Sequence, residues 1–430
     1  MKSKSNKTIA IIGLGYVGLP LAIEFGKLYP TIGFDIDARR IEELCEHKDK
    51  NEQVLSSDFT ASIHLSFSNN PIKIKKANIY IITVPTPVDE YKTPDISALL
   101  MASKIVGRGL KKGDIVIYES TTYPTCTENE CVPVLEDTSK LIYNQDFFVG
   151  YSPERINPGD KQHALTNIKK ITSGSTEKIA KEIDSLYSSI IKAGTHLAPS
   201  IQVAEAAKAI ENAQRDLNIA FVNELAIIFD KLGINTYEVL EAASSKWNFL
   251  KFTPGLVGGH CIGVDPYYLT YIASKMGYHP KIISAGRQIN DTMPTFIAQK
   301  MIKLLAKNGL EILGARILLL GITFKENCKD IRNSKVPQVA KELLDFGCDV
   351  DICDPLADES EVLKVYGIDI FNLSQSIKNA QEKKYDGMIL CVSHQEFKNL
   401  SLSLFTHKNS VIYDLKGFLN TASTQTITKL

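Results

Sequence analysis

Short apolar runs alternate with longer polar stretches along the first two hundred residues of the chain. Five of these runs are almost continuously apolar, at 8–12, 31–36, 79–84, 115–120 and 147–151. Continuous apolar character is typical of parallel strands that are covered on both faces of a sheet. Helices fit between the runs, for example at 19–28 and 97–108. The pattern therefore predicts a doubly wound α/β domain, which we place at residues 1–200.

A long helical stretch follows this region. From Ile201 to Leu232 the chain contains neither glycine nor proline, and Pro199 and Gly233 flank the stretch as start and stop signals. A continuous helix of this length would extend about 48 Å. It is either a plain connecting helix or a spine that links two domains and packs against a second subunit, and we favour the spine. With further helices expected at 236–245 and 266–276, we predict a central helical domain at 201–310.

A second α/β pattern starts near Ala315. Apolar runs that predict strands lie at 316–321, 349–353, 387–392 and 410–414, with a helix expected at 336–346. We predict a shorter Rossmann-like domain at 311–430, whose last residues, 421–430, are frayed. The predicted fold class is α/β: two Rossmann-like doubly wound domains are joined by a long central helix and a small helical domain.

Charge and cysteine usage exclude several classes of function. Lysine plus arginine and aspartate plus glutamate both total 49, so no net positive field exists to gather nucleic acid or anionic lipid. No uninterrupted apolar run reaches the roughly 18 residues of a membrane span. The apolar stretch 8–25 resembles a signal peptide, but glycines, Pro20 and Glu24 interrupt it. The eight cysteines form no C-x-x-C pair, so we expect a cytoplasmic protein without disulfides or a metal site.

A glycine-rich turn follows the first predicted strand, and its residues are Gly13, Leu14, Gly15, Tyr16, Val17 and Gly18. Gly13 permits the tight turn, Gly15 lets a pyrophosphate approach the backbone, and Gly18 lets helix and strand pack closely. The helix N-terminus supplies N–H donors for phosphates. Asp35 ends the second predicted strand, where a carboxylate binds ribose hydroxyls and repels a 2′-phosphate. The motif predicts NAD, although Arg39 and Arg40 weaken the preference over NADP; the alternative is a glycine-rich packing turn.

Cys261 follows two glycines within the segment 254–265. Consecutive glycines let the backbone approach a ligand and remove side chains near the thiol. Cys261 could be a nucleophile if its thiolate is stabilised, and Asp265 is within reach if a helix starts there. From these residues alone, a structural cysteine is the commoner alternative, and His260 is more often a packing histidine than a base.

Lys208 and Asn212 are four residues apart on the long helix and share one face. Alanines surround Lys208, so little bulk hides its ammonium group. An ammonium and an amide that converge on one point make an oxyanion site. The alternative is a solvated helix face, which the polar neighbours Glu205, Glu211 and Arg215 would also fit.

Seven ordered motifs together resemble the UDP-glucose/GDP-mannose dehydrogenase family, and the resemblance covers nearly the whole chain. The motifs are Gly13–Gly18, Pro85-Thr86-Pro87, Ser120-Thr121-Thr122, Ser152-Pro153-Glu154-Arg155, Lys208 with Asn212, Gly258–Asp265 and Gly321–Arg332. The resemblance implies oxidation of a sugar C6 alcohol through an aldehyde to a carboxylate, with two NAD⁺ consumed.

The resemblance also implies the catalytic roles. Cys261 would attack the C6 aldehyde, and the thiohemiacetal would lose a second hydride to become a thioester that water hydrolyses. Lys208 and Asn212 would stabilise the oxyanions. The water would be held or activated by three residues: Asp265, Thr121 and, as the general base, Glu154.

Binding roles follow in the same way. The implied cofactor contacts are Gly13, Leu14, Gly15, Tyr16, Val17, Gly18, Asp35, Arg40, Thr86, Thr121 and, from the C-terminal domain, Arg332. The implied substrate contacts are Glu154, Arg155, Lys208, Asn212, Phe249, Gly255, Gly258 and Lys325. Lys325 would contact the diphosphate of the UDP-sugar. The family is typically at least dimeric, with the long helix at the interface, so we expect a homodimer or a larger homo-oligomer.

Segments 246–249 and 258–269 are most similar to the UDP-N-acetylhexosamine 6-dehydrogenases of the family. Those enzymes act on UDP-GlcNAc or UDP-GalNAc and supply bacterial surface polysaccharides such as capsule or lipopolysaccharide. The segment 245–249 lacks the arginine that other members extend into a neighbouring active site. Three alternatives stay open: a UDP-glucose 6-dehydrogenase, a two-electron NAD-dependent dehydrogenase that does not need Cys261, and a non-catalytic nucleotide-sugar-binding protein.

Overall fold

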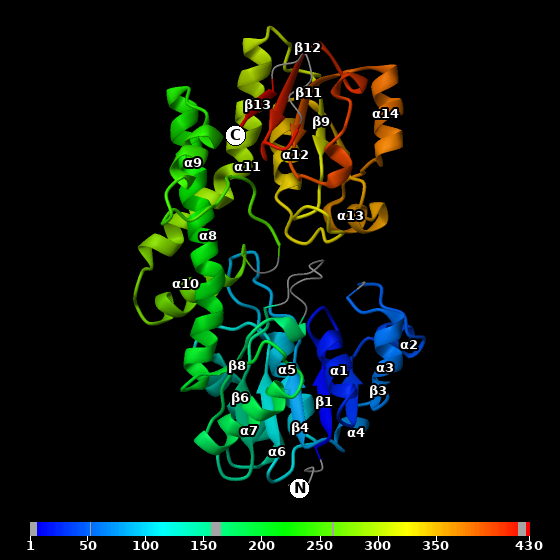
Figure 1. Cartoon of the computed structure of the whole chain (residues 1–430), viewed down its shortest axis with the longest axis vertical. Coiled ribbons are helices and arrows are strands. Elements are labelled where there is room, and N and C mark those ends of the chain that lie inside the picture. The colour runs from blue at the N-terminus through cyan, green and yellow to red at the C-terminus, as the bar shows by residue number, and fades with distance from the viewer. Residues whose placement is uncertain (1–6, 52, 156–164, 260–261, 420–426) are drawn as a thin grey trace. The chain divides into compact units, whose positions relative to one another are not determined.

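The computed structural model describes residues 7–51, 53–155, 165–259, 262–419 and 427–430 of the 430-residue chain. The chain divides into two compact units (Figure 1). The first unit comprises 1–211 and 267–278, and the second comprises 212–266 and 279–430.

A six-stranded parallel sheet forms the core of the first unit, with strand order β3-β2-β1-β4-β5-β6. Its strands are β1 (Ile9–Ile12), β2 (Thr31–Phe34), β3 (Leu65–Ser68), β4 (Ile79–Ile82), β5 (Ile115–Tyr118) and β6 (Phe148–Tyr151). Ile9 lies opposite Thr31 on one side and Ile79 on the other. The five predicted strands are confirmed, although β2 ends at Phe34 and Asp35 follows it directly. The edge strand β3 was not predicted, since its apolar residues alternate with serines.

Helices connect these strands, and the apolar side chains of both build the core of this unit. The connecting helices are α1 (Gly18–Gly26), α2 (Ala38–Cys45), α3 (Ser56–Ala61), α4 (Pro71–Ile74), α5 (Ser97–Gly107) and α6 (Val132–Ser139), and α7 (Glu177–Ser188) follows the last strand in the chain. A small parallel pair, β7 (Lys170–Thr172) and β8 (Thr195–Leu197), flanks α7 in sequence. Asp37 and Thr176 accept hydrogen bonds from backbone N–H groups at the starts of α2 and α7, which fixes where these helices begin.

The helix α8 (Ile201–Leu232) is continuous between the predicted boundaries (Figure 1). Gly233 follows it with a φ of +70°, the left-handed conformation that commonly ends helices. Three more helices are α9 (Thr236–Ser244), α10 (Asp265–Lys275) and α11 (Lys281–Lys307). The division between the two units falls within α8, after Glu211.

A five-stranded parallel sheet organises the second unit, with order β10-β9-β11-β12-β13. Its strands are β9 (Arg316–Leu320), β10 (Asp349–Cys353), β11 (Tyr385–Leu390), β12 (Thr406–Asp414) and β13 (Ile427–Lys429), and its helices are α12 (Val336–Asp345), α13 (Glu359–Tyr366) and α14 (Leu373–Glu382). The four predicted strands are confirmed. The prediction of a frayed end was wrong for 427–429, because these residues pair with β12.

Among the residues that the structure describes, no helix is long and apolar enough to cross a membrane. Over the same residues, no group of three or more His, Cys, Asp or Glu side chains could hold a metal ion. The seven cysteines in the described ranges are free thiols.

Candidate functional site

The glycine-rich turn joins β1 to α1. Gly13 has a φ of +94°, and its N–H donates to the carbonyl of Phe34 at 2.8 Å. A Cβ on Gly18 would lie 1.8 Å from the carbonyl oxygen of Gly13, so only glycine lets the helix start this close to the strand. A Cβ on Gly15 would meet nothing within 4 Å. The backbone at Gly15 is therefore open to a ligand, which fits the pyrophosphate of a dinucleotide.

Asp35 and Arg40 bond the two backbone polar groups of Leu14. The N–H of Leu14 donates to Asp35 Oδ2 at 2.8 Å, and Arg40 Nε donates to the carbonyl of Leu14 at 3.1 Å. Arg40 is buried and forms ion pairs with Glu43 at 3.2 Å and Asp49 at 2.8 Å. The structure thus gives Arg40 a role in positioning the turn, while its predicted contact with the cofactor stays a prediction.

Thr86 and Thr121 are brought together after β4 and β5. Thr86 Oγ1 donates to the carbonyl of Thr121 at 2.6 Å, and the hydroxyl of Tyr268 donates to the carbonyl of Thr86. These loops leave the carboxyl ends of parallel strands, as does the turn after β1. This edge of a doubly wound sheet is where ligands bind. The predicted cofactor residues of the first unit therefore share one edge of its sheet.

Glu154 belongs to a buried charged cluster that the sequence did not indicate. Lys170 Nζ lies 2.7 Å from Glu154 Oε2 and 2.7 Å from Glu119 Oε2, and the hydroxyl of Tyr187 donates to Glu119. Burial raises the pKa of Glu119. Burial alone would lower the pKa of Lys170, but the two carboxylates outweigh it and raise that pKa. Lys170 is therefore a charged partner that holds the Glu154 carboxylate in place.

Arg155, the next residue, points elsewhere. Its backbone N–H donates to Glu154 Oε1 at 2.6 Å, while its Nε lies 3.4 Å from Glu211 Oε2. The side chain of Arg155 is only partly buried. Its predicted contact with substrate stays a prediction.

Lys208 and Asn212 are buried on α8, with 4% and 0% of their surfaces exposed. The alternative of a solvated helix face is therefore wrong. Asn212 Nδ2 donates to Asp265 Oδ2 at 2.5 Å, and Asp265 is the first residue of α10, as expected for a carboxylate brought into reach by a helix start. Asn212 Oδ1 is buried and has no hydrogen-bond partner within the described part of the chain.

The glycines before the predicted nucleophile are required by packing within the second unit. A Cβ on Gly258 would lie 2.7 Å from the carbonyl oxygen of Asn333, and one on Gly259 would lie 2.7 Å from the ring of Phe324. Gly259 also has a φ of +81°. Cys261, with His260, lies outside the described residues.

A pocket lies in the second unit, with about 320 Å³ of empty space when the open solvent at its mouth is included. Three lysines contribute to its lining: the predicted Lys325, and Lys335 and Lys416, which sequence reasoning missed. Burial lowers the pKa of the Lys416 ammonium. The other lining residues are Leu256, Gly258, Thr323, Phe324, Glu326, Ser334, Val336, Cys391 and Val392.

The remaining predicted residues of the second unit lie beside or away from this pocket. Gly255 has a φ of +151°, and a Cβ there would lie 2.7 Å from Lys416 Nζ. Phe249 is partly buried and is not among the lining residues. Arg332 forms a paired contact with Asp330, with Nε 2.9 and 3.0 Å from the two carboxylate oxygens. The pocket therefore includes Gly258 and Lys325 of the predicted substrate set.

Comparison with known proteins finds matches along most of the chain. Three family models match in order: the NAD binding domain of the UDP-glucose/GDP-mannose dehydrogenase family at 7–191, its central domain at 202–292 and its UDP binding domain at 318–421. The chain is 55% identical to the UDP-N-acetyl-D-glucosamine 6-dehydrogenase of Salmonella typhi, covering 96% of each chain. It is 53% identical to the Pseudomonas aeruginosa enzyme of the same name, covering 96% of this chain and 97% of that one.

Among solved structures, the UDP-D-ManNAc dehydrogenase of Pyrococcus horikoshii matches with a TM-score of 0.85 at 29% identity, covering 98% of each chain. The predicted family, fold class and cofactor are confirmed. This chain belongs to the UDP-glucose/GDP-mannose dehydrogenase family and is an oxidoreductase with an NAD-binding and a UDP-binding domain.

Proposed function

We propose that this chain oxidises the C6 alcohol of a UDP-N-acetylhexosamine, UDP-GlcNAc or UDP-GalNAc, to the uronic acid. The observation that carries the proposal is the buried pair of Asn212 and Asp265 in the second unit. Asn212 Oδ1 is a buried acceptor without a partner among the described residues, and such an atom costs about 1–3 kcal/mol. A hydroxyl of the sugar or a water would satisfy it. Two relatives with more than 50% identity, both named for UDP-N-acetyl-D-glucosamine, support the choice of sugar.

NAD fits the turn after β1, because the backbone at Gly15 is open and Asp35 stands beside it. When bound, NAD supplies the hydride acceptor for each of two oxidations. Asp35 keeps the amide of Leu14 in place with one carboxylate oxygen. Its other oxygen accepts from the N–H of Asp37 and would also accept from a ribose hydroxyl.

The residues of this chain would then act on the aldehyde. The Cys261 thiolate adds to the C6 carbonyl carbon, and the ammonium of Lys208 and the amide of Asn212 stabilise the resulting oxyanion. Loss of the second hydride leaves a thioester. Water, activated by a carboxylate and placed with the help of Thr121, hydrolyses the thioester to the carboxylate and frees the thiol.

The two carboxylates proposed for this step differ in their partners. Asp265 accepts from Asn212, whereas Glu154 is paired with the ammonium of Lys170. The ion pair with Lys170 would hold the Glu154 carboxylate in position, and we propose Glu154 as the general base for the water.

The lysine-lined pocket of the second unit would hold the UDP part of the substrate. Lys325, Lys335 and Lys416 supply positive charge to a diphosphate, and Glu326 offsets part of it. A diphosphate would also favour the charged form of Lys416, against the effect of burial on its pKa. The match of the UDP-binding family model to 318–421 supports this assignment.

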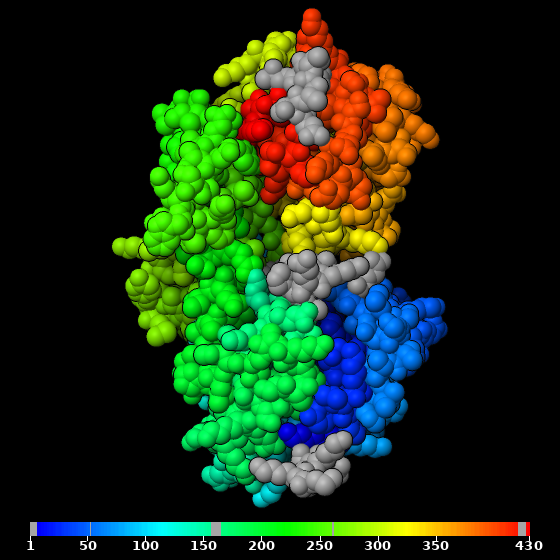
Figure 2. All heavy atoms as spheres, in the orientation of Figure 1, coloured from blue at the N-terminus to red at the C-terminus, as the bar shows by residue number. Residues whose placement is uncertain are grey.

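We also propose that two copies associate through α8. Val203, Ile210, Phe221 and Ile228 are exposed apolar residues on this helix, at spacings of seven, eleven and seven residues. These spacings place them on one face. Part of α8 lies at the surface of the molecule in the view of Figure 2. Light scattering should give a dimer that Phe221→Lys with Ile228→Lys dissociates; a wild-type monomer would contradict this.

The deciding experiment measures the NADH formed per mole of sugar, run to completion with UDP-GlcNAc, UDP-GalNAc and UDP-glucose separately. Two NADH from an N-acetylhexosamine support the proposal, and two from UDP-glucose alone would change the substrate. One NADH would mean a two-electron enzyme and would remove the covalent role of Cys261. Cys261→Ser should abolish carboxylate formation and leave NAD⁺ binding intact. If the product is a uronic acid, we further propose that the enzyme supplies precursors of surface polysaccharides.

A further inference from the structure

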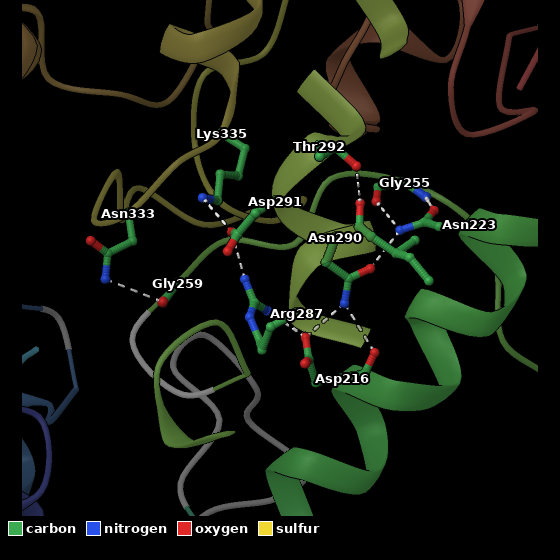
Figure 3. Close-up of polar contacts among 11 residues, drawn as sticks. Asp216, Asn223, Gly255, Gly259, Arg287, Asn290, Asp291, Thr292, Asn333 and Lys335 are labelled. Carbon is green, nitrogen blue, oxygen red and sulfur yellow. Dashed lines mark hydrogen bonds and ion pairs between the residues drawn. The ribbon is translucent and has the colours of Figure 1, made fainter. Parts of the chain in front are cut away.

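One guanidinium group in the second unit bonds two carboxylates on different helices. Arg287 of α11 donates from Nη1 to Asp216 of α8 at 2.5 Å, and from Nη2 to Asp291 of α11 at 2.7 Å (Figure 3). Arg287 is 3% exposed and Asp216 is fully buried. A buried ion pair often adds little to stability, because removing both charges from water is costly. Its place in a larger network therefore matters more than its own strength.

From Asp216 a directional chain of hydrogen bonds leads to the loop before the predicted nucleophile. Asn290 Nδ2 donates to Asp216 Oδ1 at 2.7 Å, and Asn290 Oδ1 accepts from Asn223 Nδ2 at 2.8 Å. Asn223 then bonds both polar groups of Gly255: Oδ1 accepts from its N–H at 2.8 Å, and Nδ2 donates to its carbonyl at 3.1 Å. Because a carboxylate only accepts, it fixes the orientation of each amide in turn.

From Asp291 a second connection leads to the turn before α12. Lys335 Nζ donates to the same Asp291 oxygen that accepts from Arg287, at 3.0 Å. Two residues earlier, Asn333 Nδ2 donates to the carbonyl of Gly259 at 3.4 Å. Figure 3 shows this arm and the Asn223 arm on opposite sides of Arg287. The arm therefore ties α11 to the turn and, through Asn333, to the glycine loop.

Both arms end at the lysine-lined pocket. Leu256 and Gly258, which follow Gly255, line the pocket, and so do Ser334 and Lys335. Gly255 also lies against Lys416, whose Nζ is 2.7 Å from the place of a Cβ. A shift of either segment would move the pocket lining.

We propose that Arg287 is a positioning residue for substrate binding, which fixes two walls of this pocket through Asp216 and Asp291. The inference rests on the proposed function, in which the pocket holds the UDP part of the substrate. Arg287 itself does not line the pocket. Its effect would reach the substrate through Gly255 and Lys335.

The test measures binding of UDP by calorimetry to the full-length protein, together with NAD⁺ binding and the melting temperature. Arg287→Lys keeps the charge but loses the planar fork that bonds two carboxylates at once. We expect UDP affinity to fall about tenfold, since small misplacements of a binding group are costly, while NAD⁺ affinity stays within twofold. With the substrate, KM should rise and kcat should change little. Asp291→Asn, at a less buried carboxylate, should weaken UDP binding in the same direction and by less.

Lys300→Met is the matched control. Lys300 also links α11 to α8, through an ion pair with Asp230, but neither residue reaches the pocket. This variant should lower the melting temperature and leave UDP affinity unchanged. If Arg287→Lys and Asp291→Asn behave like Lys300→Met, the residue is merely structural and the inference is overturned. If Arg287→Lys does not fold, the comparison of Asp291→Asn with Lys300→Met tests the inference by itself. Failure of the wild-type protein to bind UDP would overturn the proposed function, and this inference with it.

Discussion

The turn after β1 and the turn after β9 are built alike. Gly13 and Gly321 have φ values of +94° and +91°. The N–H of Gly13 donates to Phe34 at the end of β2, and that of Gly321 donates to Cys353 at the end of β10, both at 2.8 Å. In each unit, the first strand of the parallel sheet therefore ends in a glycine turn of the same conformation, and this turn is hydrogen-bonded to the end of the neighbouring strand.

A carboxylate stands at the same place beside each turn. Asp35 follows β2 and accepts from the N–H of Leu14 at 2.8 Å. Asp354 follows β10 and accepts from the N–H of Ile322 at 2.7 Å. In a dinucleotide-binding domain this carboxylate binds the ribose.

The two carboxylates differ in what else they contact. Asp35 is partly exposed and makes one further bond, from the N–H of Asp37 at 3.0 Å. Asp354 is buried, and its remaining partners are protein groups: the N–H groups of Thr323, Leu356 and Ala357, and His394 Nε2 at 3.2 Å. The comparison teaches that the turn alone does not identify a dinucleotide site. The carboxylate beside the first turn is partly exposed, whereas the one beside the second turn is buried and bonded by His394.

Loss of the closed carboxylate should have the largest effect. Asp354→Ala leaves several buried N–H groups and His394 without an acceptor, so we expect a loss of about 3–5 kcal/mol in the free energy of unfolding. Asp35→Ala should cost only about 1 kcal/mol. Urea denaturation of both variants measures the difference. Equal losses would mean that the two sites are equivalent.

Loss of the open carboxylate should affect the cofactor. Asp35→Asn should weaken NAD⁺ binding by roughly tenfold to a hundredfold, because a hydrogen bond to a charged group contributes about 1.5–3 kcal/mol. Asp354→Asn is the matched variant and should leave NAD⁺ affinity unchanged. Fluorescence titration gives both values. Unchanged affinity in Asp35→Asn would remove the ribose role from Asp35.

Removal of the His394 side chain should loosen the loop at 323–327, which contributes to the pocket. His394 Nδ1 accepts from the N–H of Asn327 at 3.0 Å, and Nε2 lies 3.0 Å from Thr323 Oγ1. His394→Ala should cost about 1–2 kcal/mol and weaken UDP binding, since Lys325 lies between these two contacts. His407→Ala, at a half-exposed histidine, is the control. A variant with wild-type UDP affinity would show that His394 acts on stability alone.

The smallest effect concerns pH. Burial opposes ionisation of Asp354, but the hydrogen bonds from His394 and from the N–H groups of Ile322 and Leu356 outweigh it and lower the pKa of this carboxyl. A pKa that is lower in the folded state adds stability above the unfolded value, near 4, and this stability is lost as the pH falls through the folded pKa. Between pH 6 and pH 3, the free energy of unfolding should fall more steeply in the wild type than in Asp354→Asn, by on the order of 1 kcal/mol. Parallel curves would contradict this.

The sequence by itself determined the elements with strong local signals. Near-continuous apolar runs predicted five strands of the first sheet and four of the second. The stretch without glycine or proline between Pro199 and Gly233 predicted both ends of α8 correctly. The turn at Gly13 was predicted because its glycines are required by backbone geometry. These signals lie within a few residues of one another, so no tertiary information is needed to read them.

Other features depended on partners far away in the chain. β3 was missed because it is an edge strand with half of its residues polar. Lys170 was missed because its partner Glu119 lies 51 residues earlier, and Arg287 because Asp216 lies 71 residues earlier. The roles proposed for Lys208, Asn212 and the other site residues came from the family resemblance.

Only the tertiary structure decided which of the two turns has an accessible carboxylate beside it. The residues around Gly13 and around Gly321 give the same local conformation, and each is followed by a strand and an aspartate. His394, which fills the second site, comes 40 residues after Asp354. The parallel sheet brings the two together because the carboxyl ends of its strands share one edge. Burial then completes the hydrogen bonds of Asp354 within the protein, whereas Asp35 keeps surface that a ribose can reach.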